Sequence, residues 1–102
     1  MKLLAIMGYE ETRPKVQSLF QEHKVSMISS MDIRGCNCEK TGLQAEAWFN
    51  ADEIVGTYST LCFAILDDDK AAAIMLELEK KPIAVEKDFP ARAFLMHVEK
   101  MV

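Results

Sequence analysis

The sequence predicts an α+β domain in which a strand–helix–strand unit occurs twice, forming a four-stranded antiparallel sheet with both helices on one face. Two observations lead to this prediction. Short apolar segments alternate along the chain with segments of helical periodicity. The chain has 102 residues, half of them hydrophobic and 27% charged, which suits one folded domain with one core. We therefore treat residues 1–102 as a single domain.

The first half of the chain predicts a strand, a helix and a second strand. Lys2–Gly8 is apolar at nearly every position, as in a central strand buried on both faces. Thr12 is placed to cap a helix that tolerates Pro14 in its first turn. His23 ends the apolar face of this helix and is expected to face the last carbonyls rather than act as a base. Val25–Arg34 alternates apolar and polar residues, which predicts a second strand.

The second half repeats the pattern. Tyr58–Leu66 is again apolar on both faces, and Cys62 within it is expected to be a small core residue. Asp67 begins an acidic run that caps a second helix, and Pro82 ends that helix. Ala91–Val98 predicts the last strand. This order, β-α-β-loop-β-α-β, is the ferredoxin-like plan.

Two helices cover only one face of such a sheet, and an uncovered face normally carries polar residues. Here the first and third strands are apolar on both faces, so the uncovered face is expected to form an apolar patch larger than monomers expose. The candidates, depending on register, are Leu3, Leu4, Ala5, Ile6, Leu61, Phe63 and Ile65. We infer that self-association buries this face, with a closed cyclic oligomer as the expected form.

An irregular segment of more than twenty residues, about 35–57, joins the two halves, and such long connections usually carry function. Cys36 and Cys38 could hold a soft metal together with Glu39, a histidine or the same loop of another subunit. The interpretation that the sequence favours is two ordinary thiols at a turn. The aromatic pair Trp48 and Phe49 suits either a recognition surface or an anchor against the domain.

The sequence shows no catalytic constellation. His97 lies beside apolar residues of the last strand and is expected to be a packed or edge-strand residue. We therefore expect no enzyme, unless two chains assemble a site between them. No P-loop or Rossmann motif is present. A different phosphate site could form where Lys80, Lys81 and Arg92 converge, with Gly35 allowing close backbone approach; alternatively, the lysines neutralise a helix end.

Charge and composition limit the partners and the compartment. Twelve basic against sixteen acidic residues give a net charge of −4, which argues against general binding of nucleic acid or anionic membranes. The longest apolar runs are far shorter than the ~18 residues that a spanning helix requires. Three cysteines are too few for a secreted disulfide framework. We expect a cytoplasmic protein without membrane insertion.

The layout resembles the PII nitrogen-regulatory and PII-like family of signalling proteins. Met1–Ile6 is similar to the first strand of that family, and Val25–Gly35 to its second strand, which ends in the glycine that enters the long T-loop. Leu61–Lys70 is similar to its third strand and second-helix start. Ala91–Phe94 followed by Val98 and Glu99 resembles its Gly-Lys-Ile-Phe strand.

The resemblance implies a homotrimer that binds an effector in clefts between subunits and regulates an enzyme or membrane transporter through the T-loop. The effector is expected to be an adenine nucleotide (ATP, ADP or AMP) or another small molecule, with a divalent metal in some members. By position, Gly35 matches the glycine entering the T-loop, Glu39 falls near the loop-base glutamine that helps hold magnesium, and Arg92 stands at the phosphate-binding lysine.

The chain departs from the family where the nucleotide phosphates would bind. The second helix runs through Lys80 and Lys81 directly into Pro82, where the family has a glycine-rich loop around the phosphates. A metal or redox signal at Cys36 and Cys38 could therefore replace nucleotide sensing. The alternative function is that of a trimeric metal-binding protein resembling the CutA group, which uses these two thiols.

Overall fold

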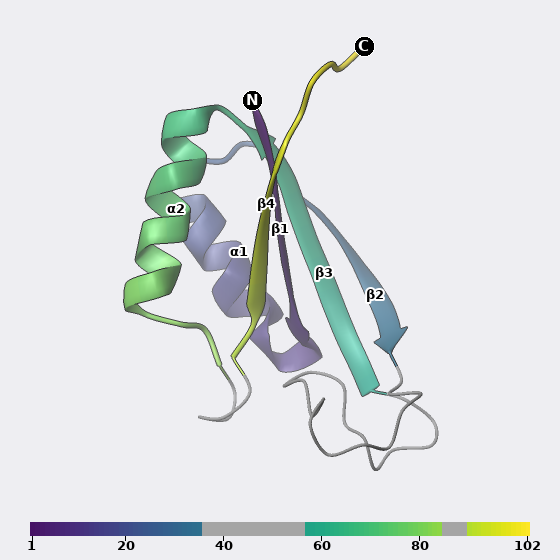
Figure 1. Cartoon of the computed structure of the whole chain (residues 1–102). Coiled ribbons are helices and arrows are strands. Elements are labelled where there is room, and N and C mark those ends of the chain that lie inside the picture. Colours follow the sequence, from purple (N-terminus) through teal and green to yellow (C-terminus); the bar gives the residue numbers. More distant parts are fainter. Residues whose placement is uncertain (36–56, 85–89) are drawn as a thin grey trace, which may run out of the picture.

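The computed structural model describes residues 1–35, 57–84 and 90–102, which form four strands, two α-helices and a short 3₁₀ turn (Figure 1). In chain order the elements are β1 (Lys2–Tyr9), the 3₁₀ turn (Glu10–Thr12), α1 (Arg13–Glu22), β2 (Ser29–Gly35), β3 (Thr57–Leu66), α2 (Asp68–Lys80) and β4 (Arg92–His97).

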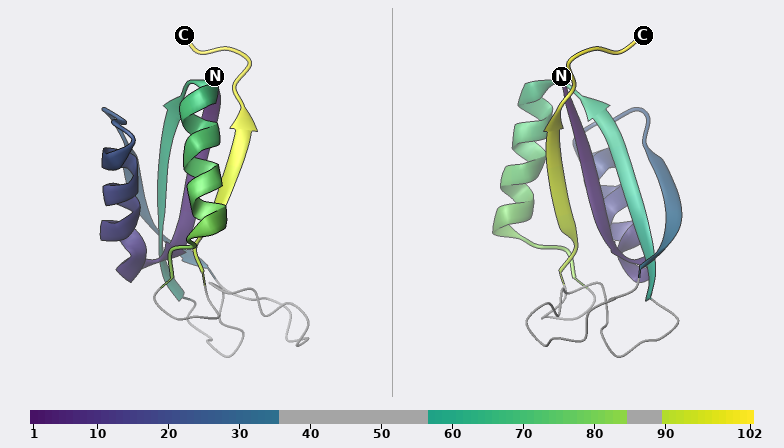
Figure 2. Two further views of the ribbon diagram at one scale, coloured as in Figure 1. Left: turned by 90° about the vertical axis from the view of Figure 1, so that its left-hand side faces the viewer. Right: turned by 45° about the vertical axis from the view of Figure 1, so that its right-hand side comes forward.

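The strands form one antiparallel sheet in the order β2-β3-β1-β4. Both helices lie on the same face of this sheet, and the opposite face has no helix over it (Figure 2). The predicted ferredoxin-like fold is therefore confirmed. Because β1 and β3 are the central strands, most of their backbone groups pair on both sides, whereas β2 and β4 form the two edges.

The core lies between the sheet and the helices. From the strands it takes Leu4, Ile6, Cys62, Ala64 and Leu66, all at most 6% exposed. From α1 it takes Val16, Leu19 and Phe20, and from α2 Ala71 and Ile74. The core residues of each helix lie on one face, in keeping with the helical periodicity of the sequence, and Cys62 is a core residue as predicted.

The turn from β1 into α1 is close-packed. A side chain at Gly8 would bring its Cβ to 3.0 Å from the Cβ of Ala91 and 3.1 Å from Oγ1 of Thr12, so a larger residue here would require its neighbours to move by a few tenths of an ångström. Thr12 stands at the N-cap of α1, and Pro14 lies in the first turn, as predicted. However, the Thr12 hydroxyl does not cap the helix: it donates to the carbonyl of Tyr9, 2.6 Å away, because the 3₁₀ turn brings that carbonyl within reach.

The connection from α1 to β2 corrects the predicted second strand. β2 begins at Ser29, not at Val25, so only part of the alternating segment pairs with β3. Lys24, with φ of 59°, turns the chain in the left-handed region. Val25 and Ile28 then pack against the core before the strand begins.

The helices are also joined by a contact that the sequence did not predict. His23 does end α1, but its side chain does not face the last carbonyls: its Nε2 lies 2.9 Å from Oε1 of Glu77 in α2.

Asp67 caps α2 as predicted, since its side chain accepts from the backbone N–H of Lys70 at 2.8 Å. Lys80 occupies the last turn of that helix.

Candidate functional site

The register of the strands identifies the side chains on the face without helices, which we call the open face. Leu3, Ala5 and Met7 alternate with the core residues of β1 and therefore point away from the helices. Their partners extend the same rows across the sheet. β1 and β3 contribute Leu3, Ala5, Met7, Leu61, Phe63 and Ile65. β2 and β4 contribute Ser29, Met31, Ile33, Phe94 and Met96.

The sequence left open which apolar residues of β1 lie on this face. The structure assigns Leu3 and Ala5 to the open face, and it places Leu4 and Ile6 in the core beneath the helices. All the candidates from β3 proposed from the sequence, which are Leu61, Phe63 and Ile65, lie on the open face.

The open face is apolar and substantially exposed in the single chain. Met31, Ile65, Phe94 and Met96 are between 42% and 50% exposed. Its rows also contain three residues that are not apolar: Ser29, the buried Ser59 opposite Ile33, and Arg92 opposite Met7. Few monomeric proteins leave so continuous an apolar surface in water, and such a surface is typical of an interface.

One end of the sheet collects the ends of several elements, and we call it the loop end. Because the strands are antiparallel, β2 ends there with Gly35, β3 begins there with Thr57 and β4 begins there with Arg92 (Figure 1). α2 also ends on this side of the sheet, with Lys80 in its last turn and Lys81 directly after it. The side chains of Lys80, Lys81 and Arg92 are all exposed. The sequence-predicted effector residues that the structure describes thus belong to one end of the molecule.

A polar cluster that no sequence pattern predicts also lies toward the loop end. The guanidinium of Arg13, at the start of α1, contacts Oδ1 of Asp32 in β2 and donates to Oγ1 of Thr60 in β3 at 3.2 Å. Nε of Arg13 is buried without a hydrogen-bond partner. Oγ of Ser59 is a second such atom, but Ser59 lies on the opposite face of β3 from Thr60. This cluster connects α1 to both strands that lead into the long segment. No spacing in the sequence marks it, since Arg13 and Thr60 are 47 positions apart.

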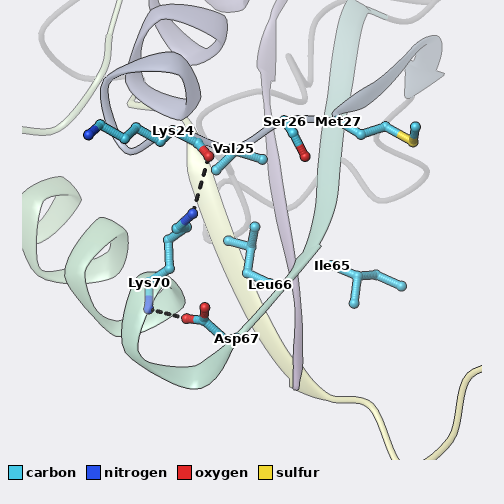
Figure 3. Close-up of a pocket in the computed structure, with 8 residues that line it drawn as sticks. All are labelled: Lys24, Val25, Ser26, Met27, Ile65, Leu66, Asp67 and Lys70. Carbon is cyan, nitrogen blue, oxygen red and sulfur yellow. Dashed lines mark hydrogen bonds between the residues drawn. The ribbon is translucent and has the colours of Figure 1, made fainter.

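The opposite end of the sheet has a small polar pocket of about 210 Å³ (Figure 3). Nζ of Lys70 donates to the carbonyl of Lys24 at 3.1 Å, and the carboxylate of Asp67 is occupied by the cap of α2. These groups therefore hold the α1–β2 connection against the start of α2. Their polar atoms are engaged within the chain, so this pocket is a weaker candidate for a ligand site than the loop end.

Next to this pocket, the amino terminus is fixed by the start of α2. The α-ammonium group of Met1 donates to Oδ1 of Asp68 at 2.7 Å. That hydrogen bond and the positive charge beside it lower the pKa of the Asp68 carboxyl below its ordinary value of 3.8. The pair is solvent-exposed, so its contribution to stability is small.

Several predicted site residues lie outside the described residues. These are Cys36, Cys38, Glu39, Trp48 and Phe49. In the part of the chain that the structure does describe, no three His, Cys, Asp or Glu side chains gather as metal ligands. His97 is an exposed residue at the end of the edge strand β4, as predicted. Within the same described ranges, no helix combines the length and apolar character needed to cross a membrane.

No family model matches the chain, and no curated protein matches it. Among solved structures, the fold is similar to that of a protein from Thermus thermophilus described as a candidate PII-like signalling protein, with a TM-score of 0.62. The match covers 92% of this chain and 80% of that chain at 11% sequence identity. The resemblance noted in the sequence is therefore confirmed at the level of the fold: the chain adopts the fold of a PII-like signalling protein.

Proposed function

We propose that the chain is a PII-like regulatory protein, a homotrimer that senses a small effector in clefts between subunits and regulates an enzyme or membrane transporter through residues 35–57. The open apolar face carries this proposal, together with the shared fold. A fold alone does not determine function, so the argument depends on what this surface and the loop end are suited to do.

The open face suits a second copy of the same chain better than a charged partner. Apart from Arg92 at its loop end, its side chains carry no charge, and residues such as Phe94 and Met96 are enriched at protein interfaces. When the assembly closes as a ring, the apolar surface of every copy is covered by a neighbouring copy.

The loop end suits an anionic effector. Lys80, Lys81 and Arg92 supply positive charge, and Gly35 has no side chain to obstruct a ligand. An adenine nucleotide (ATP, ADP or AMP) fits this chemistry through its phosphates. Glu39 would supply a carboxylate for an accompanying divalent metal. We propose binding and regulation here, without catalysis.

Light scattering coupled to size-exclusion chromatography tests the assembly. The wild-type chain is expected to elute as a trimer at micromolar concentration. Phe63→Lys places a charge on the open face and is expected to yield folded monomers, because a buried unpaired charge opposes association. The matched control is Leu76→Lys on α2, where the leucine is already 52% exposed, and it should stay trimeric. A wild-type monomer at these concentrations would overturn the proposed assembly.

Titration calorimetry with ATP, ADP and AMP tests the effector. Arg92→Glu and Lys81→Glu are each expected to weaken binding about tenfold or more, the equivalent of a lost charge-assisted hydrogen bond. Lys100→Glu, an exposed position beyond the end of β4 that lies away from the loop end, is the control of equal charge change. Equal weakening by the control would mean that only net charge matters and would reject a site at the loop end.

The metal-binding alternative depends on residues outside the described ranges and stays a prediction. Cys36→Ser combined with Cys38→Ser should abolish binding of zinc or copper(I) if a CutA-like function holds. If the regulatory function holds, the double variant should still bind the effector. Trp48→Ala and Phe49→Ala test the role of the aromatic pair. If these variants remain trimeric but no longer bind the regulated partner, the two side chains belong to the recognition surface.

A further inference from the structure

Methionine is concentrated on the open face. The chain has seven methionines, and the register assigns three of them, Met7, Met31 and Met96, to this face. Two more, Met27 and Met101, line an apolar groove of about 320 Å³ with Phe63 and Ile65 at the end of the sheet away from the loop end. Together these five form a methionine-rich surface on and beside the open face.

The methionines of the open face are accessible in the single subunit. Met31 is 50% exposed and Met96 is 46% exposed, whereas Met75 on α2 packs against the core. The neighbours of Met31 and Met96 across the strands, Leu61 and Leu3, are apolar. Within the subunit, an oxygen atom added to either sulfur would therefore have an apolar side chain directly across the strand pair.

We propose that the open face is a redox-sensitive modification site, in which a peroxide oxidises Met31 and Met96 to sulfoxides and thereby prevents assembly. This inference rests on the proposed self-association through that face. The thioether sulfur takes one oxygen atom from hydrogen peroxide: an S–O bond forms, the O–O bond breaks, and water leaves. Sulfur is oxidised by two electrons and the peroxide is reduced by two.

Peroxide oxidises the free subunit, and the consequence is weaker association between subunits. A thioether is apolar and flexible and packs well between apolar surfaces. A sulfoxide is a strong hydrogen-bond acceptor, and burying it without a donor opposes association. Two such groups in each subunit are expected to raise the dissociation constant about a hundredfold or more. Because assembly covers the sulfurs, oxidation is also expected to slow as protein concentration rises.

The test treats the full chain with hydrogen peroxide and measures mass by light scattering and sulfoxides by peptide mass spectrometry. The treated protein is expected to be monomeric while its far-ultraviolet circular dichroism is unchanged. Dithiothreitol, which reverses disulfides and sulfenic acids, should not restore assembly. Methionine sulfoxide reductases A and B together should restore it.

A matched variant separates these methionines from the cysteines. Met7→Leu/Met31→Leu/Met96→Leu keeps side-chain volume and all three cysteines, and it is expected to stay assembled after peroxide. Oxidation of Met27 and Met101 in that variant shows that the peroxide reacted. Met75→Leu is the control and should remain as sensitive as the wild type.

The outcomes distinguish this inference from the assembly itself. Wild-type protein that carries sulfoxides at Met31 and Met96 yet remains assembled would overturn the redox site and leave the proposed trimer standing. Dissociation of the triple variant to the same extent as the wild type would also overturn it. A chain that is monomeric before any treatment would overturn both proposals at once.

Discussion

The two faces of the sheet are made from alternate residues of the same strands, yet they meet different surroundings. Leu66 is 6% exposed beneath the helices, and its neighbour Ile65 is 43% exposed on the open face. The two side chains are similar in size and polarity, so composition does not distinguish the faces. The helix-covered face is completed within one chain, whereas the open face needs a second molecule to become a core.

Shortening Leu66 and Ile65 to alanine is expected to give the largest difference in stability between the two faces. Leu66→Ala should lower the free energy of unfolding by about 2–5 kcal/mol, because it leaves a cavity in a packed core. Ile65→Ala should lower it by less than about 1 kcal/mol in the monomer, where the side chain is already partly in water, and should weaken association instead. Urea unfolding of both variants, each made in the monomeric Phe63→Lys background, measures the change in the free energy of unfolding. Equal destabilisation by both variants would contradict the distinction between the faces.

Cys62 provides a chemical measure of how well the helices exclude solvent. Its side chain is 1% exposed, and burial raises the pKa of its thiol above the ordinary value of 9.0. In a Cys36→Ser/Cys38→Ser background, reaction with iodoacetamide at pH 8 should be at least about a hundredfold slower than in urea, because the thiol reacts only after opening. Alkylation at the unfolded rate in buffer would show that this face is open to water.

The same thiol predicts a change of stability with pH. Above about pH 9 the unfolded chain releases the thiol proton more readily than the folded chain does, because the pKa of Cys62 is raised by folding. The raised pKa therefore contributes its full stabilisation of the fold only below about pH 9. That contribution is lost as the pH rises above this value toward the pKa of the folded state. Cys62→Ala should therefore lose less stability than the wild type between pH 8 and 10 in denaturant titrations.

The cap of α2 is expected to have an intermediate effect. Asp67→Ala removes the acceptor for the backbone N–H of Lys70 and should cost about 1 kcal/mol. Asp69→Ala, an exposed residue in the first turn, is the control and should cost less. Thermal unfolding of both variants measures the difference, and equal costs would mean that only negative charge near the helix start matters.

The contact between the helices should contribute least. A double-mutant cycle with His23→Ala and Glu77→Ala is expected to give a coupling energy of about 0.2–1 kcal/mol, since both side chains are partly exposed. A coupling energy of zero would mean that the contact between the two helices does not stabilise the fold.

The sequence was sufficient for the order of elements, because their patterns are local. The buried stripe of each helix, the Asp67 cap and the apolar central strands follow from residues within a few positions of one another. The start of β2 was wrong because Val25 and Met27 alternate with polar residues without pairing to β3. Alternation did not report burial here, since Met27 is 80% exposed, and the turn at Lys24 delays strand pairing until Ser29.

The candidate site was predicted less completely, since it depends on register. In β1 both Leu3 and Leu4 are apolar, and only their pairing with β3 shows which one faces the helices. The contacts of Arg13 with Asp32 and Thr60, and of His23 with Glu77, join residues far apart in the chain, so no spacing rule finds them. The residues of the long segment keep their predicted roles as hypotheses.

Gly35 and Thr57, the residues that bracket the long segment, are direct partners in the antiparallel pairing of β2 with β3. Both ends of the insertion are therefore anchored one strand-width apart, whatever the length between them. Related chains could exchange this insertion for one of different size or composition without rebuilding the scaffold. Recognition and folding would then evolve almost independently within one small domain.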